Sequence, residues 1–167
     1  MRTLSSSLAL PLFLALRISA ADFSAGLSAY QKKDYAAAVK EWRPLAEKGD
    51  APSQFNLGLM YVDGLGVPQD YNQALSWFER SAQQDYAKAQ LNLGAMYASG
   101  KGVKRDYVQA YKWLNVCAAK GEQKCVAQRD LVAGKLKPKQ LVAAQKLSSE
   151  FTPKQEPGKS DPDNPDK

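Results

Sequence analysis

The chain has 167 residues, of which 44% are apolar and 24% are charged, and its formal net charge is +6. This profile is typical of one ordinary folded domain. Because the sequence contains no histidine, it excludes a Ser-His-Asp triad, a Cys-His pair and histidine-based metal sites or pH switches.

Residues 1–21 have the features of a secretory signal peptide. Arg2 precedes an apolar run at 8–16, and small residues follow it. The run has about half of the ~20 apolar residues that a membrane-spanning helix needs, and its Ala-Ala end suits signal peptidase. We therefore expect cleavage after Ala20 or Ala21 and a periplasmic or secreted mature chain without a transmembrane segment. An uncleaved anchoring helix is the alternative.

A repeat with a period of 36 residues organises the middle of the chain. Residues 55–90 align without a gap onto residues 91–126, with shared Asn-Leu-Gly, Met-Tyr, Gly-x-Gly-Val, Asp-Tyr, Gln-Ala and Trp segments. A diverged copy at 22–54 keeps Asp-Tyr and two alanines at the same offset but lacks the Gly-x-Gly-Val segment. A fixed period of this length predicts a stack of identical supersecondary units.

The residue pattern of each copy predicts a hairpin of two helices. In the second copy, apolar residues at three- and four-residue spacing favour a helix over about 52–62. Gly64 follows it and suits the left-handed conformation that ends a helix. Asp70 is a good N-cap, so the second helix is expected to begin at Tyr71. The third copy repeats this pattern.

A glycine also recurs inside the first helix of both full copies, as Gly58 and Gly94. Glycine in a helix interior costs about 1 kcal/mol relative to alanine. A cost that recurs at the same position predicts a close approach of two helices there.

The pattern Asn-Leu-Gly-x-Met-Tyr-x-x-Gly-x-Gly-Val-x-x-Asp-Tyr-x-x-Ala-x-x-Trp resembles the Sel1-like repeat family, which is related to the tetratricopeptide repeats. The resemblance covers about residues 22–126, and the first copy is closer to a tetratricopeptide hairpin. It implies an all-α fold, an α-solenoid of about three repeats. It also implies an adaptor or scaffold function.

Two cysteines lie at the end of the third copy. Cys117 is near the end of a predicted second helix, and Cys125 follows eight residues later, across a turn. In a secreted protein such a pair favours a disulfide over two free thiols, and the spacing resembles that of cysteine-rich Sel1-repeat proteins. A redox-active dithiol is the alternative, but the Cys-x-x-Cys spacing is missing.

The C-terminal part divides into two segments. Residues 127–151 predict two helices, the second beginning at Pro138, that cap the open end of the solenoid. Residues 152–167 contain four prolines and no apolar aliphatic side chain. We expect them to form a disordered, solubilising tail, with a docking peptide as the alternative.

A solenoid binds partners on its concave surface. If the tetratricopeptide groove positions carry over by resemblance, the candidate binding residues are Phe55, Leu59, Asp63, Leu91, Ala95 and Ser99. Contacts of Phe55 and Leu91 with the core are the competing interpretation. For Asn56 and Asn92, a hydrogen bond from helix to loop is favoured over a clamp on a peptide backbone.

No motif supports catalysis, a metal site or a cofactor. The serines we considered as nucleophiles lack a lysine three residues on. Basic residues in the third copy are interleaved with acidic ones, which favours a solvated surface over nucleic-acid binding. We therefore predict a monomeric, non-catalytic adaptor that binds a protein or peptide. The alternative is a peptidoglycan- or β-lactam-recognising protein with at most weak hydrolysis, because some cysteine-rich members of the family are associated with β-lactams.

Overall fold

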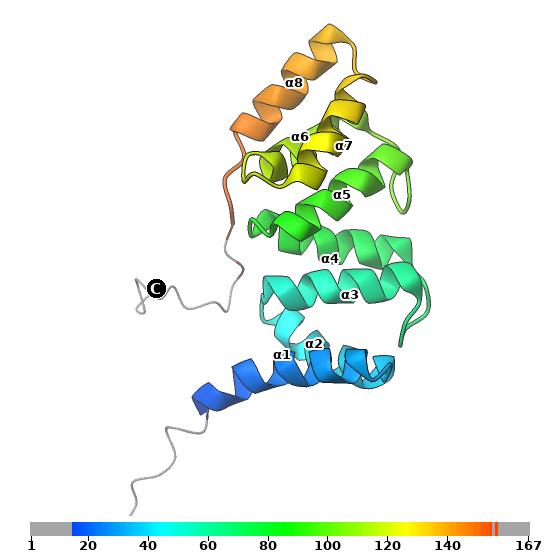
Figure 1. The fold of residues 1–167 in the computed structure, drawn as a ribbon, viewed down its shortest axis with the longest axis vertical. Helices are drawn as coiled ribbons and strands as arrows, with labels where there is room; N and C mark the ends of the chain where they lie inside the picture. Colours follow the sequence, from blue (N-terminus) through cyan, green and yellow to red (C-terminus); the bar gives the residue numbers. More distant parts are fainter. Residues whose placement is uncertain (1–14, 155, 157–167) are drawn as a thin grey trace, which may run out of the picture.

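The computed structural model describes residues 15–154 and 156, and within them it is entirely helical. The helices are α1 (Ala15–Gln31), α2 (Tyr35–Glu47), α3 (Ala51–Asp63), α4 (Tyr71–Gln83), α5 (Ala87–Ser99), α6 (Tyr107–Ala118), α7 (Gln123–Ala133) and α8 (Pro138–Ser149). Each helix from α1 to α6 packs against the next, α8 packs against α6, and the hairpins stack from α1 at one end to α8 at the other (Figure 1). The predicted all-α solenoid is confirmed.

Capping residues fix the ends of the hairpin helices where the sequence predicts them. The Asp70 carboxylate accepts hydrogen bonds from the backbone N–H groups of Asn72 and Gln73, at 2.9 and 3.1 Å. Asp106 caps α6 in the same way. At the other end, Gly64 closes α3 with a left-handed φ of 67°. These contacts satisfy backbone groups that helix ends leave without a partner.

Glycines inside the first helix of each of the first three hairpins bring its two helices into close contact. A Cβ built on each glycine would lie far inside the van der Waals radius of a large side chain in the second helix. The pairs are Gly26 with Trp42 at 2.4 Å, Gly58 with Phe78 at 2.5 Å, and Gly94 with Leu114 at 2.6 Å. The close approach predicted for Gly58 and Gly94 is confirmed, and the diverged first hairpin shares it.

The Gly-x-Gly-Val loops fasten each hairpin to the preceding one. Gly66 and Gly102 have left-handed φ angles of 70° and 69°. A Cβ on either would lie 2.5 Å from the backbone at the start of the preceding hairpin's second helix, at Tyr35 and Tyr71 respectively. The first hairpin has no such loop, and its turn instead passes through Lys33 with a φ of 62°.

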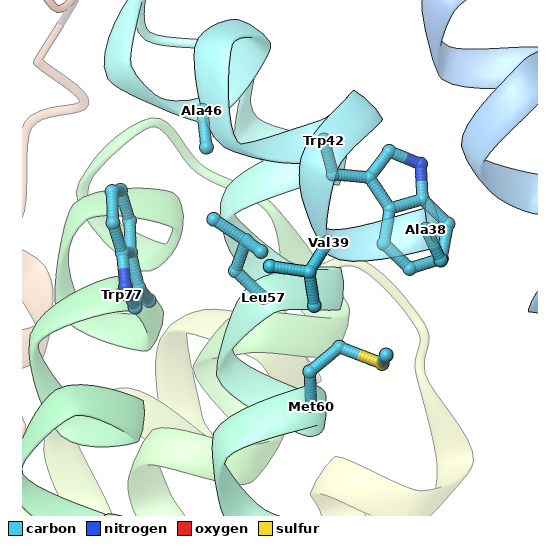
Figure 2. Packing of buried hydrophobic residues seen from close by; sticks show 7 residues of the cluster. All are labelled: Ala38, Val39, Trp42, Ala46, Leu57, Met60 and Trp77. Carbon is cyan, nitrogen blue, oxygen red and sulfur yellow. The ribbon is translucent and has the colours of Figure 1, made fainter. Parts of the chain in front are cut away.

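Adjacent hairpins share their hydrophobic core. One cluster joins three helices and consists of Ala38, Val39, Trp42 and Ala46 of α2, Leu57 and Met60 of α3, and Trp77 of α4 (Figure 2). Trp42, Leu57 and Met60 are at most 2% exposed. Since each large apolar side chain contributes about 1.5–3 kcal/mol when fully buried, this shared core holds α4 in a fixed position against the preceding hairpin.

A disulfide joins Cys117 of α6 to Cys125 of α7, and both cysteines are fully buried. Their Cα atoms lie 5.8 Å apart, an ordinary distance for a disulfide. The predicted staple between two helices is thus present. Helices α7 and α8 both pack against α6, so the disulfide ties the last hairpin to the end of the stack.

The expected disordered tail requires a correction for the part that the structure describes. Just before the tail, Phe151, the last residue of the predicted cap, packs edge-on against Trp113, with ring centroids 5.4 Å apart. The Lys154 N–H donates to the Gln83 carbonyl at 2.8 Å, and Glu156 forms an ion pair with Arg80. These residues therefore lie along the solenoid (Figure 1). Composition favoured disorder, but it does not register specific contacts with distant helices. Residues 155 and 157–167 lie outside the described part.

The predicted signal peptide lies mostly outside the described residues. Its last part, from Ala15, forms the beginning of α1, so the expected cleavage site after Ala20 or Ala21 falls within this helix. Cleavage there stays a prediction. Among the helices of the described residues, none combines the length and the apolar character needed to cross a bilayer.

Candidate peptide-binding pocket

A pocket of about 310 Å³ opens between α3, α4 and α5. Its lining residues are Val62 of α3, Tyr71 and Phe78 of α4, Asn92, Ala95, Met96 and Ser99 of α5, and Lys101 of the following loop. Phe78 and Met96 belong to the core cluster beneath it. The pocket therefore has an apolar floor and polar groups at several points of its wall, which is the usual character of a ligand site.

The regular turn of α5 builds one wall of the pocket. Asn92 is three and four residues before Ala95 and Met96, and Ser99 is three and four residues after Met96 and Ala95, so the four lie on one face of the helix. Small side chains at Ala95 and Ser99 leave the space open. This spacing was visible in the sequence and identifies Asn92 as a fourth member of the face.

The glycine loop builds the opposite rim. Gly102 lies directly on the Tyr71 backbone, which only a residue without a Cβ can do. This approach places the neighbouring Lys101 beside the pocket, with its ammonium 5.7 Å from the centre of the Tyr71 ring. A cation at that distance interacts favourably with an aromatic face. The sequence indicated only a dispersed basic surface here and missed Lys101 as a site residue.

The six predicted binding residues do not come together in one site. Ala95 and Ser99 line the pocket. Phe55 packs between aromatic rings, with its centroid 5.8 Å from that of Phe78 and 5.4 Å from that of Tyr86. This contact supports the core interpretation that the sequence left open for Phe55.

The other three predicted residues also lie outside the pocket wall. Leu59 packs against the same core cluster as Phe55, and Leu91 packs against the two clusters nearer the C-terminus. Asp63 is the last residue of α3 and is exposed. Leu59 and Leu91 therefore contribute to the hydrophobic core between the helices.

Asn92 differs from the prediction. Its side-chain amide donates to the Lys88 carbonyl one turn earlier in α5, at 2.9 Å. The expected hydrogen bond from helix to loop is therefore wrong for Asn92, because the intrahelical carbonyl is the nearer acceptor. In the structure the loop is held instead by backbone bonds such as that from the Asp106 N–H to the Tyr97 carbonyl, at 2.9 Å.

A half-buried tyrosine joins the two helices that flank the pocket. The Tyr97 hydroxyl of α5 donates to a Glu79 carboxylate oxygen of α4 at 3.0 Å. Burial, followed by the charge of Glu79 and its hydrogen bond, raises the pKa of Tyr97 to about 12. The hydroxyl thus stays protonated at neutral pH and keeps α5 in register with α4.

The residues that the structure describes contain no group of three or more candidate metal ligands. What the pocket offers is an apolar floor, the Asn92 amide and the Lys101 ammonium. Such a set of groups can hold an apolar side chain of a peptide and contact its polar backbone.

Comparison with known protein families assigns the repeats. The Sel1 repeat model matches residues 51–86 and 87–121. Each matched unit begins at the first residue of α3 or α5, four residues before the copies that the sequence placed at 55–90 and 91–126, and with the same period.

The solved structures that share the fold include two repeat proteins. One is c5321, a protective antigen present in uropathogenic Escherichia coli strains that displays an SLR fold, with a TM-score of 0.76 and 34% identity over 80% of this chain and 29% of the antigen. The other is a Sel1 repeat protein from Oxalobacter formigenes, with a TM-score of 0.63 and 25% identity over 78% of this chain and 54% of that protein. This chain thus spans less than two thirds of either structure. A search of the curated proteins finds no match.

The stacked hairpins and their shared core define an α-solenoid built from helical repeats. The hairpins at residues 51–86 and 87–121 are Sel1 repeats, and solenoids of such repeats typically serve as scaffolds for protein interactions.

Proposed function

We propose that this protein is a non-catalytic scaffold that binds an extended segment of another protein through the pocket between α3, α4 and α5. The observation that carries the proposal is the pocket itself, which is open, has an apolar floor and is bordered by Lys101. Predicted groove residues Ala95 and Ser99 line it. A peptide that presents an apolar side chain beside a carbonyl or carboxylate suits these groups.

The binding segment is expected to run across more than one hairpin. The pocket draws its walls from α3, α4 and α5, which belong to two consecutive repeats. Because the stacked repeats form an extended surface, a ligand that follows the stack contacts several of them. An extended peptide fits this geometry better than a compact ligand does.

The proposed place of action is the cell envelope or the exterior of the cell. The signal-like residues 1–21 and the buried disulfide both support it, because disulfides persist in oxidising compartments. The similar antigen c5321 is described as protective, which is consistent with exposure on that protein's cell. Mass spectrometry of the chain from an envelope fraction tests this: we expect an N-terminus at Ala21 or Asp22, and a chain that begins at Met1 would contradict it.

A photo-crosslinking residue placed at Ser99 tests the pocket. Ser99 is exposed at the pocket wall, so we expect it to capture the partner. The matched control carries the same residue at Ser76, which is exposed on α4 and is not part of the pocket. The proposal predicts a crosslinked product from Ser99 that Ser76 does not give and that Ala95→Glu abolishes. Equal products from both positions would refute it.

A further inference from the structure

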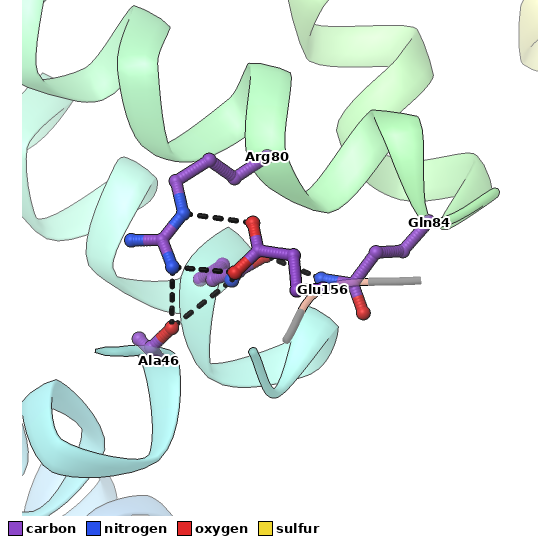
Figure 3. Close-up of polar contacts among 5 residues, drawn as sticks. Ala46, Arg80, Gln84 and Glu156 are labelled. Atoms are coloured by element: carbon purple, nitrogen blue, oxygen red, sulfur yellow. Dashed lines mark hydrogen bonds and ion pairs between the residues drawn. The ribbon is translucent and has the colours of Figure 1, made fainter. Parts of the chain in front are cut away.

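A second site lies at the edge of the solenoid, where the turn between α2 and α3 meets the end of α4. Gly49, Gln54 and Arg80 form a slot there, which we call the carboxylate slot, and Glu156 occupies it. Figure 3 shows the Arg80 guanidinium facing the Glu156 carboxylate. Arg80 Nε donates to Glu156 Oε1 at 2.8 Å, and Nη2 of the same guanidinium donates to Oε2. Gln54 Nε2 donates to Oε2 at 3.0 Å.

The next repeat shows why this slot exists. The residue 36 positions after Gly49 is Asp85, and the one after Gln54 is Gln90. Gln90 Nε2 donates to the Asp85 carboxylate at 3.0 Å, as Gln54 Nε2 donates to Glu156. One repeat therefore supplies the carboxylate from its own turn, whereas the other obtains it from the C-terminal segment.

Because position 49 is a glycine, there is room for the Glu156 side chain. Gly49 and Asp85 both have left-handed backbones, with φ of 93° and 68°. A Cβ on Gly49 would lie 2.9 Å from the Cβ of Glu156. The Glu156 side chain thus enters the space that an aspartate side chain occupies one repeat later.

The donors of the slot are held in place by other parts of the protein. Gln84 donates to Gln54 Oε1 at 2.8 Å, so the Gln54 amide turns its N–H groups toward the Ala46 carbonyl and the slot. Arg80 Nη2 also donates to Ala46, and its guanidinium lies 4.7 Å from the centre of the Trp77 ring. An arginine fixed in this way is suited to bidentate recognition of a carboxylate.

The contacts before Glu156 define a peptide-binding mode. The Phe151 ring covers Trp113, the Lys154 N–H bonds to the Gln83 carbonyl, and the Glu156 carboxylate fills the slot. The described residues 150–154 and 156 contain no helix after Ser149. The occupant is therefore an extended segment with an aromatic residue five positions before a glutamate.

We propose that this edge of the solenoid is a second peptide-binding site, which takes an extended partner segment carrying a glutamate, and that the C-terminal segment of this chain occupies it as an intramolecular ligand. The slot pairs a guanidinium with a carboxylate, so charge complementarity selects an acidic segment. Arg80 and Glu156 keep 34% and 17% of their side-chain surface exposed. An incoming carboxylate can reach the slot from solvent and replace Glu156.

This site is separate from the pocket. Gln54 lies near the start of α3 and Arg80 in the last turn of α4, whereas Val62 and Tyr71 of the pocket lie at the opposite ends of these helices. A partner at the slot thus leaves the pocket free, and each site can be tested without the other.

The test titrates a labelled synthetic peptide of residues 150–158 into the full chain. In the wild type the tethered segment competes at an effective concentration in the millimolar range, so weak binding is expected. In Glu156→Gln the segment loses its charged contact, and the peptide should bind at least about tenfold more tightly. Glu150→Gln is the matched control: Glu150 pairs only with Lys146 among the described residues, and this variant should behave as the wild type.

Two further variants locate the binding in the slot. A peptide with glutamine in place of its second glutamate should not bind the Glu156→Gln chain. Gly49→Asp should supply the carboxylate from the turn, as Asp85 does, and so release the C-terminal segment and prevent peptide binding. Release is read from trypsin cleavage after Lys154, which we expect to be about tenfold faster in Gly49→Asp and Glu156→Gln. Circular dichroism verifies that each variant is folded.

Equal peptide affinity for the wild type and Glu156→Gln would overturn the proposal. So would the absence of binding to Glu156→Gln at millimolar peptide, because the C-terminal segment would then be only a structural strap. Peptide binding that persists in Gly49→Asp would place the site elsewhere and would equally overturn it.

Discussion

Alanine at position 58 tests the close contact between α3 and α4, where Gly58 lies against Phe78. Gly58 lies in the middle of α3, where alanine would gain about 1 kcal/mol in helix propensity. The new Cβ, however, would lie 2.5 Å from the Phe78 ring, which is 1% exposed. Ordinary carbon contacts are about 3.5–4.0 Å, so the two groups would overlap by roughly 1 Å.

The overlap outweighs the propensity gain. Overpacking a close-packed core costs about 1–3 kcal/mol, and a clash with a buried aromatic ring falls in the upper part of that range. We therefore expect Gly58→Ala to lower the free energy of unfolding by about 2 kcal/mol. For a chain of this size, this corresponds to a fall in Tm of roughly 4–8 °C.

Urea denaturation of the full chain, followed by far-UV circular dichroism, measures the effect. Gly134→Ala is the matched control, because Gly134 has a helical φ of −65° and its Cβ would meet no atom closer than 3.6 Å. That variant should be within about 0.5 kcal/mol of the wild type or more stable. In a Phe78→Ala background, Gly58→Ala should cost less by about 1–3 kcal/mol. If Gly58→Ala is as stable as Gly134→Ala, the close contact does not limit this position.

Three further predictions concern the Cys117–Cys125 disulfide, the Tyr97 hydroxyl and the glycine loop at Gly66. Replacing Cys117 and Cys125 together by alanine should lower the free energy of unfolding by about 2–3 kcal/mol in urea denaturation, and an unchanged urea midpoint would contradict a stabilising disulfide. Because the pKa of Tyr97 is raised to about 12 in the folded chain from about 10 when unfolded, its contribution is fully present below pH 10 and is lost as the pH rises through 12. Urea midpoints between pH 9 and 12 should therefore fall less steeply in Tyr97→Phe, and identical slopes would refute this. Gly66→Ala should cost about 2 kcal/mol or more because it meets the preceding helix backbone. Gly121→Ala, which has a φ of 83° but open space around it, should cost only about 1 kcal/mol, and equal losses would show that backbone conformation alone matters at Gly66.

Much of the fold could be predicted because its determinants are local and repeated. The Asp70 cap, the left-handed Gly64 and the internal Gly58 each act within one hairpin, and each has a counterpart 36 residues later. The disulfide could be predicted from Cys117 and Cys125 because they lie on either side of one turn.

The contacts of Lys154 and Glu156 could not be predicted because they join residues more than 70 positions apart. Composition places Glu156 in a polar, proline-rich stretch and gives no indication of its acceptor role. One signal was nevertheless present: aligning the repeats places Gly49 opposite Asp85 beside a retained glutamine. When the repeat keeps the glutamine but has glycine in place of the aspartate, another part of the chain is expected to supply the carboxylate.

The lining of the pocket was predicted only in part, because groove positions were carried over from a related repeat. Ala95 and Ser99 depend on the register of a single helix, and the structure places both at the pocket. Lys101 depends on how the glycine loop lies against Tyr71, and Phe55 depends on the ring of Phe78 in α4 and that of Tyr86, the N-cap residue of α5. These are tertiary relations that helix periodicity does not contain.

The central claim is that the pocket between α3, α4 and α5 binds the partner. Its most direct test is the affinity of the partner segment captured by the crosslinker at Ser99, measured by calorimetry with the wild type, Ala95→Glu and the control Ser76→Glu. We predict that Ala95→Glu weakens binding at least about tenfold, because it fills the pocket and buries a charge on its apolar floor, whereas Ser76→Glu binds as the wild type does. Equal affinities for all three folded proteins would contradict the claim.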